Sequence, residues 1–389
     1  MRTAEQLSAI LPDSERMSAV LKLFTKVPVF SDDPGIPSIF LEALREMVEF
    51  HVRNNPAYAA YLTYHGFRTS DLRQPEDEER LPFYHANFFK THVLKSIRDD
   101  QVYRHYTSSG TTGQKSQMFF DEWSFELMEY MVGRNMKARG LVSERPVNNI
   151  LFGYEPYEQS TIGTAMSTVL LSTFAPSRNR FFALRQAGNG KHEFDIYGAI
   201  RTFQDYAQEG IPVRIYGFPA FFYFTLRRMK DLGIKPLSFH AESTAMFGGG
   251  WKGFASKQIP KPDFYREIEE YFGIAQDRCI DSFGSVEHFV PYLECPRHHF
   301  HLPVWSDAVI RDVRTLRSAG YGQPGFLNFI SPYISCAPAN SLMLGDLGML
   351  HEPDSCGCGN PRPWFEILGR AGTSKNKSCA IAAAELLRR

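Results

Sequence analysis

Residues 196–230 have the sequence IYGAIRTFQDYAQEGIPVRIYGFPAFFYFTLRRMK, in which one short strand is expected between two helices. Residues 196–208 suit a helix, and Gly210-Ile211-Pro212 ends it, because glycine and proline interrupt helices. The apolar run Val213–Tyr216 predicts a strand. Pro219 is expected at the start of the second helix, where proline is favoured. This succession is typical of an α/β fold with parallel strands.

The same alternation continues toward the C-terminus. A further strand is predicted to end at Gly248-Gly249-Gly250, a helix to fill residues 261–272, and another strand to span Cys279–Phe283. Ligand loops in such folds lie beyond the carboxyl ends of the parallel strands. Beyond residue 300 the predicted strands are shorter and glycine and proline are more frequent. We therefore predict an α/β fold with parallel-sheet αβα lobes and a small β lobe.

The first 98 residues are predicted to be mainly helical. Leu41, Leu44, Val48 and His51 recur at helical spacing, and Asn54-Asn55-Pro56 ends that run. These apolar positions share one face of the helix and are expected to pack inward.

Composition excludes several classes of protein. The chain has 389 residues, of which 43% are hydrophobic, and its 43 basic residues balance 43 acidic ones. A formal net charge of zero argues against a nucleic-acid partner or an anionic membrane surface. The N-terminus lacks the pattern of a signal peptide, and the apolar stretch 164–175 is too short and polar for stable membrane insertion. We expect a cytoplasmic protein.

A stretch of hydroxyl side chains and glycines, YTSSGTTGQKS at residues 106–116, has the composition of a phosphate-binding loop. Glycines let backbone N–H groups approach a phosphate, hydroxyls add donors, and lysine adds positive charge. It is not a Walker A loop, because the GxxxxGK[ST] spacing is absent. From composition alone, a polar surface turn is an equally good interpretation. The residues concerned are Thr107, Ser108, Ser109, Gly110, Thr111, Thr112, Gly113 and Lys115.

This loop resembles the [ST]-S-G-T-T-G-x-x-K loop of the adenylate-forming superfamily, which includes acyl-CoA ligases, luciferases and peptide-synthetase adenylation domains. Lys115 comes one residue earlier than the commonest spacing, as in the phenylacetate-CoA ligase and acyl-protein synthetase branches. The resemblance implies ATP as a substrate, with Lys115 and the hydroxyls at its phosphates.

Two motifs further along the chain strengthen the resemblance. Gly248-Gly249-Gly250 follows a predicted strand, where the backbone would lie against a nucleobase; alone, it would more simply be a tight turn. Residues 282–287, SFGSVE, resemble the Y-G-x-T-E motif of the superfamily. That match implies that Phe283 and Gly284 contact adenine and that Glu287 helps to hold Mg²⁺. Without the match, Glu287 would more simply be a solvated acid.

The last two motifs come in the expected order. Leu344-Gly345-Asp346 resembles the T-G-D motif, which implies that Asp346 accepts hydrogen bonds from the ribose hydroxyls. Leu368-Gly369-Arg370 resembles the G-R hinge motif, which implies that Arg370 reaches ribose or phosphate. The chain departs from the motif at Gly372, where the superfamily has Asp or Lys.

The C-terminal residues resemble one branch of the superfamily. Nineteen residues follow Arg370, in place of a full C-terminal lobe, and include the sequence KNKSCAIA at 375–382. This ending, with Gly-Gly-Gly-Trp-Lys at 248–252, is similar to the acyl-protein synthetases of bacterial luciferase operons. The similarity implies that Cys379 accepts the acyl group as a thioester and passes it to an acyl reductase. Lys375 and Lys377 would lower the pKa of its thiol, although a free cysteine in a C-terminal helix is the simpler interpretation without the match.

Together these motifs divide the chain into three parts. Residues 1–98 form the mainly helical start of the large domain, 99–367 the nucleotide- and acyl-binding core, and 368–389 the hinge remnant and tail.

Cysteines and histidines gather in two further segments, ECPRHHFH at 294–301 and CGCG at 356–359. Paired cysteines with a Cys/His cluster suit tetrahedral Zn²⁺, although C-x-C is tighter than the usual spacing. A resemblance to some phenylacetate-CoA-ligase-like enzymes favours a structural site. The ligand set that it implies is Cys295, His301, Cys356 and Cys358, with His298 or His299 as alternatives for the fourth ligand. The other interpretation is reduced thiols in a polar loop.

The predicted function is therefore ATP-dependent activation of a carboxylic acid, expected to be a long-chain fatty acid, and transfer of the acyl group to a thiol. The aromatic segment 216–222 lines either the acyl pocket or the core. One alternative is an acyl- or aryl-CoA ligase of the phenylacetate type, or an adenylating enzyme that loads a carrier protein. The other is a non-catalytic subunit that binds acyl groups or nucleotides.

Overall fold

The computed structural model describes residues 2–107, 116–156, 168–188 and 191–371. Its N-terminal part is helical, as predicted, and α3 buries one face that includes Leu44, Met47 and His51. Pro75–Arg80 forms a 3-10 helix. The helical elements are α1 (Ala4–Ala9), α2 (Ser18–Thr25), α3 (Ile36–Asn54), α4 (Pro56–Tyr64), η1 (Thr69–Asp71), η2 (Pro75–Arg80), α5 (Phe88–Thr91) and η3 (Asp99–Gln101).

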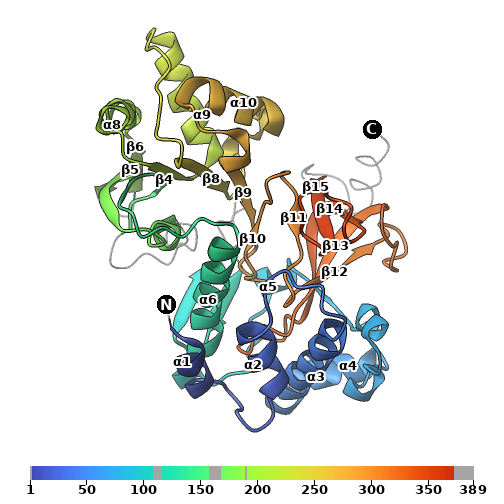
Figure 1. Cartoon of the computed structure of the whole chain (residues 1–389). Coiled ribbons are helices and arrows are strands. Elements are labelled where there is room, and N and C mark those ends of the chain that lie inside the picture. Colours follow the sequence, from blue (N-terminus) through green and yellow to red (C-terminus); the bar gives the residue numbers. More distant parts are fainter. Residues whose placement is uncertain (1, 108–115, 157–167, 189–190, 372–389) are drawn as a thin grey trace.

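A seven-stranded sheet forms the second part, in the order β10-β9-β8-β7-β4-β5-β6 (Figure 1). Its five central strands are parallel, and β10 and β6 are antiparallel at the two edges. The strands are β4 (Val147–Tyr154), β5 (Ser177–Gly188), β6 (Lys191–Phe194), β7 (Val213–Gly217), β8 (Thr244–Gly248), β9 (Cys279–Phe283) and β10 (Tyr292–Leu293).

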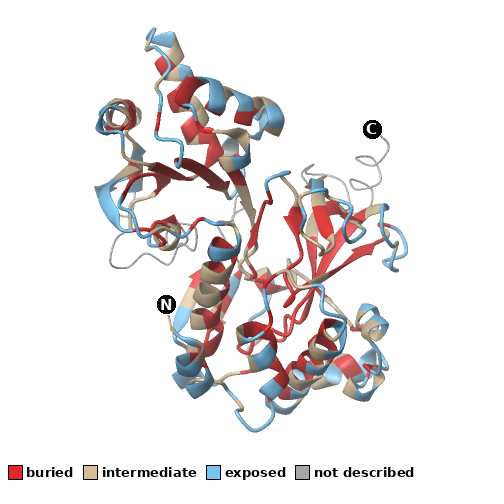
Figure 2. Cartoon of the chain, viewed as in Figure 1, coloured by how far each residue is buried: buried red, intermediate tan, exposed pale blue. Residues whose placement is uncertain are grey.

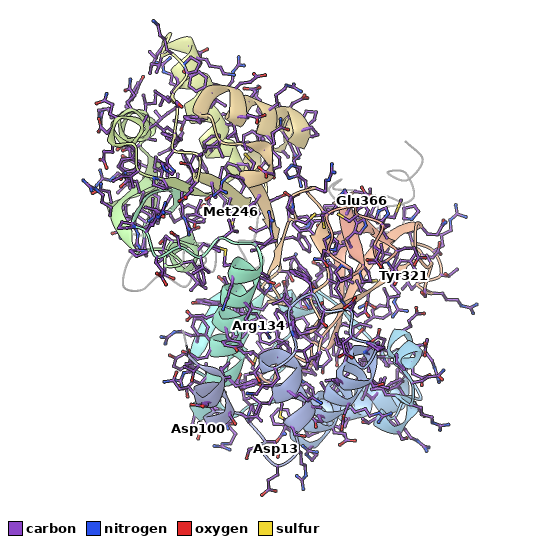
Figure 3. All side chains as sticks on the ribbon, viewed as in Figure 1. Asp13, Asp100, Arg134, Met246, Tyr321 and Glu366 are labelled. Carbon is purple, nitrogen blue, oxygen red and sulfur yellow. The ribbon has the colours of Figure 1, made fainter. Side chains whose placement is uncertain are left out.

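Helices cover both faces of this sheet, which confirms the predicted α/β fold. Phe203, Phe222 and Phe264, from α8 (Ile196–Glu209), α9 (Pro219–Asp231) and α10 (Lys261–Phe272), pack with strand residues on one face. On the other face α6 (Glu122–Ala138) packs through Met136 against Met246, which Figure 3 labels. The short 3-10 helices η4 (Lys252–Lys257) and η5 (Gln276–Arg278) follow β8 and α10.

A second sheet, β11-β15-β14-β13-β12, forms the C-terminal lobe, and β1 pairs in parallel with β14. Its three central strands are not shorter than those of the first sheet, contrary to the prediction, since β13, β14 and β15 have 7, 11 and 7 residues and β7, β8 and β9 have 5 each. Gly348 lies inside β14 and does not end it. Glycine is needed at this position, because a Cβ there would lie 2.5 Å from the Glu366 carbonyl oxygen of the neighbouring strand. The strands are β1 (Tyr84–His85), β11 (Phe300–His301), β12 (Asp307–Arg311), β13 (Pro324–Ile330), β14 (Ser341–His351) and β15 (Trp364–Arg370), and the separate hairpin is β2 (Arg104–Thr107) with β3 (Gln117–Phe120).

One hydrophobic core joins the N-terminal helices to the C-terminal sheet (Figure 2). Phe24 of α2 stacks on Trp305, at 5.9 Å between ring centroids. Arg134 of α6 donates to the carbonyl oxygens of Phe24 and Val27, at 2.6 and 2.5 Å. Helices from the start of the chain are therefore packed against the strands that end it. No described helix is long and apolar enough to cross a membrane.

Candidate functional site

The predicted phosphate loop connects the two strands of a hairpin. Thr107 pairs with Gln117 where the described residues stop, and residues 108–115, including Lys115, lie outside them. Phe120 of the hairpin stacks on Phe289 at 4.3 Å between centroids, and Tyr106 contacts the same ring at 6.1 Å. The base of the loop is therefore packed against the turn that carries Glu287.

That turn spans residues 285–289 and is held by its own backbone. The Phe289 N–H donates to the Ser285 carbonyl oxygen at 2.7 Å, and the His288 N–H donates to Ser285 Oγ at 3.2 Å. Phe289 has a φ of 57°, which is uncommon for a bulky residue. The turn leaves Glu287 only 6% exposed. A buried carboxylate is costly unless a cation or donors accompany it.

Asp346 and Arg370 lie close to this carboxylate. The two residues are direct partners in the antiparallel pair of β14 and β15. Burial raises the pKa of Asp346, the Arg370 guanidinium opposes the shift, and the negative charge of Glu287 adds to it. The structure thus brings together three of the predicted nucleotide-site residues, two acidic and one basic.

The residues predicted to contact adenine end two neighbouring parallel strands. Gly248 of β8 is paired with Ser282 of β9, and Gly249 and Gly250 follow with φ of 73° and 65°. Phe283 is only partly buried, and it packs among aromatic rings. Its partners, at 5.9 to 6.2 Å between centroids, are Tyr292, Phe300, Phe329 and Phe365. Gly284 follows it on the surface.

The four residues predicted as zinc ligands form a second site. The ligand atoms of Cys295, His301, Cys356 and Cys358 all lie within 4.8 Å of one another. Cys295 Sγ is 3.5 Å from Cys356 Sγ, and Cys358 Sγ is 3.3 Å from His301 Nε2. Three thiols and one imidazole are a donor set that zinc accepts in structural sites.

Local backbone geometry orients these ligands. The N–H groups of Arg297 and Asn360 donate to Cys295 Sγ and Cys358 Sγ, each at 3.4 Å. Gly357 and Gly359 have φ of 72° and 83°, which allows the tight turn of the C-x-C segment. His301 Nδ1 lies 2.8 Å from the Arg362 carbonyl oxygen; as a donor there, it leaves Nε2 unprotonated for a metal.

The two alternative histidines differ in position. His299 Nδ1 lies 3.1 Å from Cys356 Sγ, and its ring stacks on Trp364, so it adjoins the cluster. His298 Nδ1 instead lies 3.6 Å from Glu294 Oε2.

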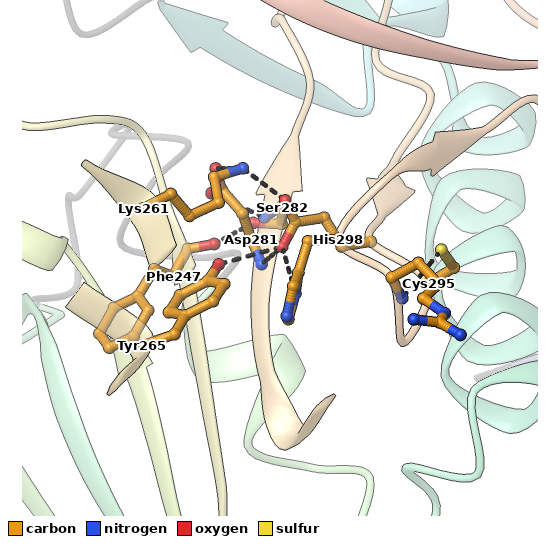
Figure 4. A network of polar contacts seen from close by, with 9 residues as sticks. Phe247, Lys261, Tyr265, Asp281, Ser282, Cys295 and His298 are labelled. Carbon is orange, nitrogen blue, oxygen red and sulfur yellow. Dashed lines mark hydrogen bonds and ion pairs between the residues drawn. The ribbon is translucent and has the colours of Figure 1, made fainter. Parts of the chain in front are cut away.

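A buried network beside the cluster, drawn in Figure 4, was not predicted. Glu294 is fully buried; it accepts from the Asp281 N–H at 2.8 Å and the Tyr265 hydroxyl at 3.0 Å, and it pairs with Lys261. Through Ser282, whose hydroxyl donates to the Phe247 carbonyl oxygen at 2.8 Å, the network reaches β8. Glu294 stood within the quoted motif, but nothing in the sequence indicated Lys261 or Tyr265 as its partners.

A further cation faces the cluster. Burial lowers the pKa of Arg139, and the neighbouring acidic groups, of which Cys295 and Asp277 act most strongly, oppose that shift. Its Nε has no hydrogen-bond partner within the described part of the chain.

Two other predictions remain. Cys379, Lys375 and Lys377 lie outside the described residues. In the aromatic segment, Phe218, Ala220 and Phe222 are buried, and a Cβ at Gly217 would lie 2.4 Å from the backbone of Phe152. The glycine thus lets two strands approach closely, and the segment belongs to the core.

The chain is similar to a family of ligases. Residues 29–388 match the family described as acyl-protein synthetase, LuxE. Two relatives, from Vibrio harveyi and Aliivibrio fischeri, are each named long-chain-fatty-acid–luciferin-component ligase. The first is 23% identical over 338 residues (87% of this chain, 85% of that protein). The second is 25% identical over 351 residues (89% of this chain, 88% of that protein).

Solved structures of 2-hydroxyisobutyryl-CoA ligase share the fold. The open conformation, in complex with 2-HIB-AMP and CoA, has a TM-score of 0.66 at 15% identity and covers 90% of this chain and 79% of that chain. The postadenylation state with 2-HIB-AMP has a TM-score of 0.68, also at 15% identity, and covers 90% and 71%. At this identity the likeness concerns the fold, which agrees with the predicted adenylate-forming architecture.

Proposed function

Because the chain belongs to the LuxE family of acyl-protein synthetases, we propose that its ligase activity converts a long-chain fatty acid to an acyl-adenylate and transfers the acyl group to Cys379. The observation that carries the proposal is the grouping of Glu287, Asp346 and Arg370 beside the base of the predicted phosphate loop. The proposed setting is the cytoplasm, which supplies ATP and keeps thiols reduced.

In the first step a carboxylate oxygen of the acid attacks the α-phosphorus of ATP. The bond from that phosphorus to the bridging oxygen breaks, and pyrophosphate leaves with the electron pair. Asp346 accepts hydrogen bonds from the ribose, and Arg370 donates to ribose or phosphate. Lys115 and the loop hydroxyls offset the charge on the phosphates.

The residues around Glu287 fit a magnesium ion. Mg²⁺ prefers oxygen ligands, and Glu287 supplies a buried carboxylate close to a second one, Asp346. When bound, the ion neutralises charge on the departing pyrophosphate. Glu287 would hold it, together with oxygens of the substrate phosphates.

In the second step the thiolate of Cys379 attacks the acyl carbon. The bond to the AMP oxygen breaks, AMP leaves, and a thioester remains on the protein. A reductase that consumes thioesters is the class of partner that would take this product.

We also propose that Cys295, His301, Cys356 and Cys358 hold a structural Zn²⁺, with His299 as the alternative to His301. The spacing of the ligand atoms and the N–H groups that face the sulfurs support this assignment. The ion would cross-link β11 and the loop before it to the loop before β15, and it would take no part in the chemical step.

Intact-protein mass spectrometry tests the function. Wild type, Cys379→Ser and Glu287→Ala are incubated with ATP, Mg²⁺ and a panel of fatty and aromatic acids. The expected result is a hydroxylamine-labile acyl adduct on wild type alone, largest with a long-chain fatty acid.

Other outcomes separate the alternatives. Pyrophosphate release without an adduct would reassign the acceptor to CoA or a carrier protein. An absence of pyrophosphate release with every acid would indicate a non-catalytic subunit.

A further inference from the structure

His288 follows Glu287 directly and is more deeply buried, at 2% exposure. Its Nε2 lies 2.7 Å from the Tyr292 hydroxyl, which in turn lies 2.5 Å from Ser306 Oγ. Its ring stacks on Tyr292 and on Phe329, at 5.9 and 5.0 Å between centroids. A buried imidazole is neutral here, since burial lowers the pKa of His288 to about 3.

The partners of His288 belong to both sheets. Tyr292 lies in β10, at the edge of the parallel sheet, whereas Phe329 lies in β13 of the C-terminal sheet and Ser306 directly precedes β12. His288 therefore fixes the turn that carries Glu287 relative to the sheet that carries Asp346 and Arg370.

From this geometry we propose that His288 is a positioning residue, which acts with Tyr292 and Ser306 to hold the Glu287 carboxylate at the distance from Asp346 and Arg370 that a metal–nucleotide complex requires. The inference rests on the proposed function, because it assigns His288 a role only through Glu287. A displacement of about 1 Å at a catalytic group can cost about 100-fold in rate, and an unanchored turn would permit one.

His288→Phe tests the proposal, because it keeps a ring for stacking and removes only the hydrogen bond. Carboxylate-dependent ATP–pyrophosphate exchange is measured over a range of Mg²⁺ concentrations, below the unfolding temperature. We expect a maximal rate about 10- to 100-fold lower and a higher half-saturating Mg²⁺ concentration. His288→Gln, which retains a polar group, is expected to recover part of both parameters.

His51 offers a matched control. It is also fully buried, it lies 2.7 Å from a serine hydroxyl, Ser96, and burial lowers its pKa to about 3 as well. It lies in α3, and its hydrogen-bond and ring partners among the described residues are not predicted site residues; they are Ser96, Ile334, Phe50 and Tyr58. His51→Phe is expected to lower the melting temperature and leave the Mg²⁺ dependence unchanged.

Two results would overturn the proposal: an unchanged rate and Mg²⁺ dependence in His288→Phe, or equal changes in both variants. If His288→Phe does not fold, Ser306→Ala is measured instead, because it removes the last hydroxyl of the hydrogen-bond series that links His288, Tyr292 and Ser306. This variant must shift the same Mg²⁺ dependence, or the proposal is wrong. A fully active Glu287→Ala would instead refute the magnesium role in the proposed function.

Discussion

The two candidate sites are built in opposite ways. The Cys/His cluster draws its ligand atoms from two loops and from the short strand β11, and all four atoms lie within 4.8 Å of one another. The acidic site takes Glu287 from a turn and Asp346 and Arg370 from strands, and Arg370 is exposed. The four ligand atoms of the cluster are thus close enough to share one ion. The acidic site instead combines a buried carboxylate, Glu287, with an exposed guanidinium, Arg370, that a substrate can reach.

If the zinc bound by the Cys/His cluster is structural, removing it must lower the free energy of unfolding more than it lowers the catalytic rate. Cys356→Ser is expected to abolish zinc binding and lower the free energy of unfolding by about 5 kcal/mol, a fraction of the binding energy of structural zinc. Metal content by plasma mass spectrometry and urea unfolding check this. Cys279→Ala, which removes a buried thiol outside the cluster, must leave the metal content unchanged; one equivalent of zinc in Cys356→Ser would refute the assignment.

The reverse is expected at the acidic site. Glu287→Ala should lower pyrophosphate exchange by about 100- to 1,000-fold, or about 3–4 kcal/mol, because the charge on the departing pyrophosphate loses its counterion. Zinc content and melting temperature should remain close to wild type. Parallel loss of zinc would mean that the two sites are not independent.

Acid should weaken the fold through His51 and His288. The unfolded chain protonates histidine near pH 6.5, whereas burial lowers both folded pKa values to about 3. The unfolded state therefore binds more protons between these values. The stabilisation is full above pH 6.5 and is lost as pH falls toward 3, by about 2 kcal/mol per histidine between pH 7 and 5. Urea unfolding of wild type and His51→Phe at both pH values checks this; equal pH sensitivity of the two proteins would contradict it.

The smallest expected effect concerns the ribose. Asp346→Asn should raise the KM for ATP by about tenfold, or 1.4 kcal/mol, for one weakened charge-assisted bond. Since burial raises the pKa of Asp346, the wild type should lose ATP affinity on acidification at a higher pH than an ordinary aspartate would cause. If the ATP affinity of Asp346→Asn falls on acidification at the same pH as that of the wild type, a group other than Asp346 causes the loss.

Sequence predicted best where the signal was local. The bounds of α8, α10, β7 and β9, the start of α9 and the end of β8 were expected within one or two residues of those observed, because glycine and proline mark many of these ends. Cysteine and histidine are uncommon enough for four to be chosen from two segments, and the structure brings those four together.

Other features depend on contacts between distant parts of the chain. The residues next to Phe283 in the sequence do not predict the aromatic rings that surround it, such as Phe365. The partners of Glu294 could not be predicted from its sequence neighbours either. The aromatic segment 216–222 was compatible with a pocket or with the core, and only the structure shows that its Gly217 lies against the backbone of Phe152. Strand length in the C-terminal sheet was underestimated. The sequence does not distinguish a glycine that ends a strand from one such as Gly348, which lies within a strand and lets the neighbouring strand approach closely.

The pairing of the start of the chain with its end has a consequence for synthesis. His51 Nε2 bonds with the carbonyl oxygen of Ile334, 283 residues further along, and β1 completes its pairing only on β14. At about 5–20 residues per second, the ribosome holds the N-terminal helices without these partners for tens of seconds. Their apolar faces are then open to chaperones, and the parallel-sheet lobe, whose strands all lie between residues 147 and 293, is the part that can fold first.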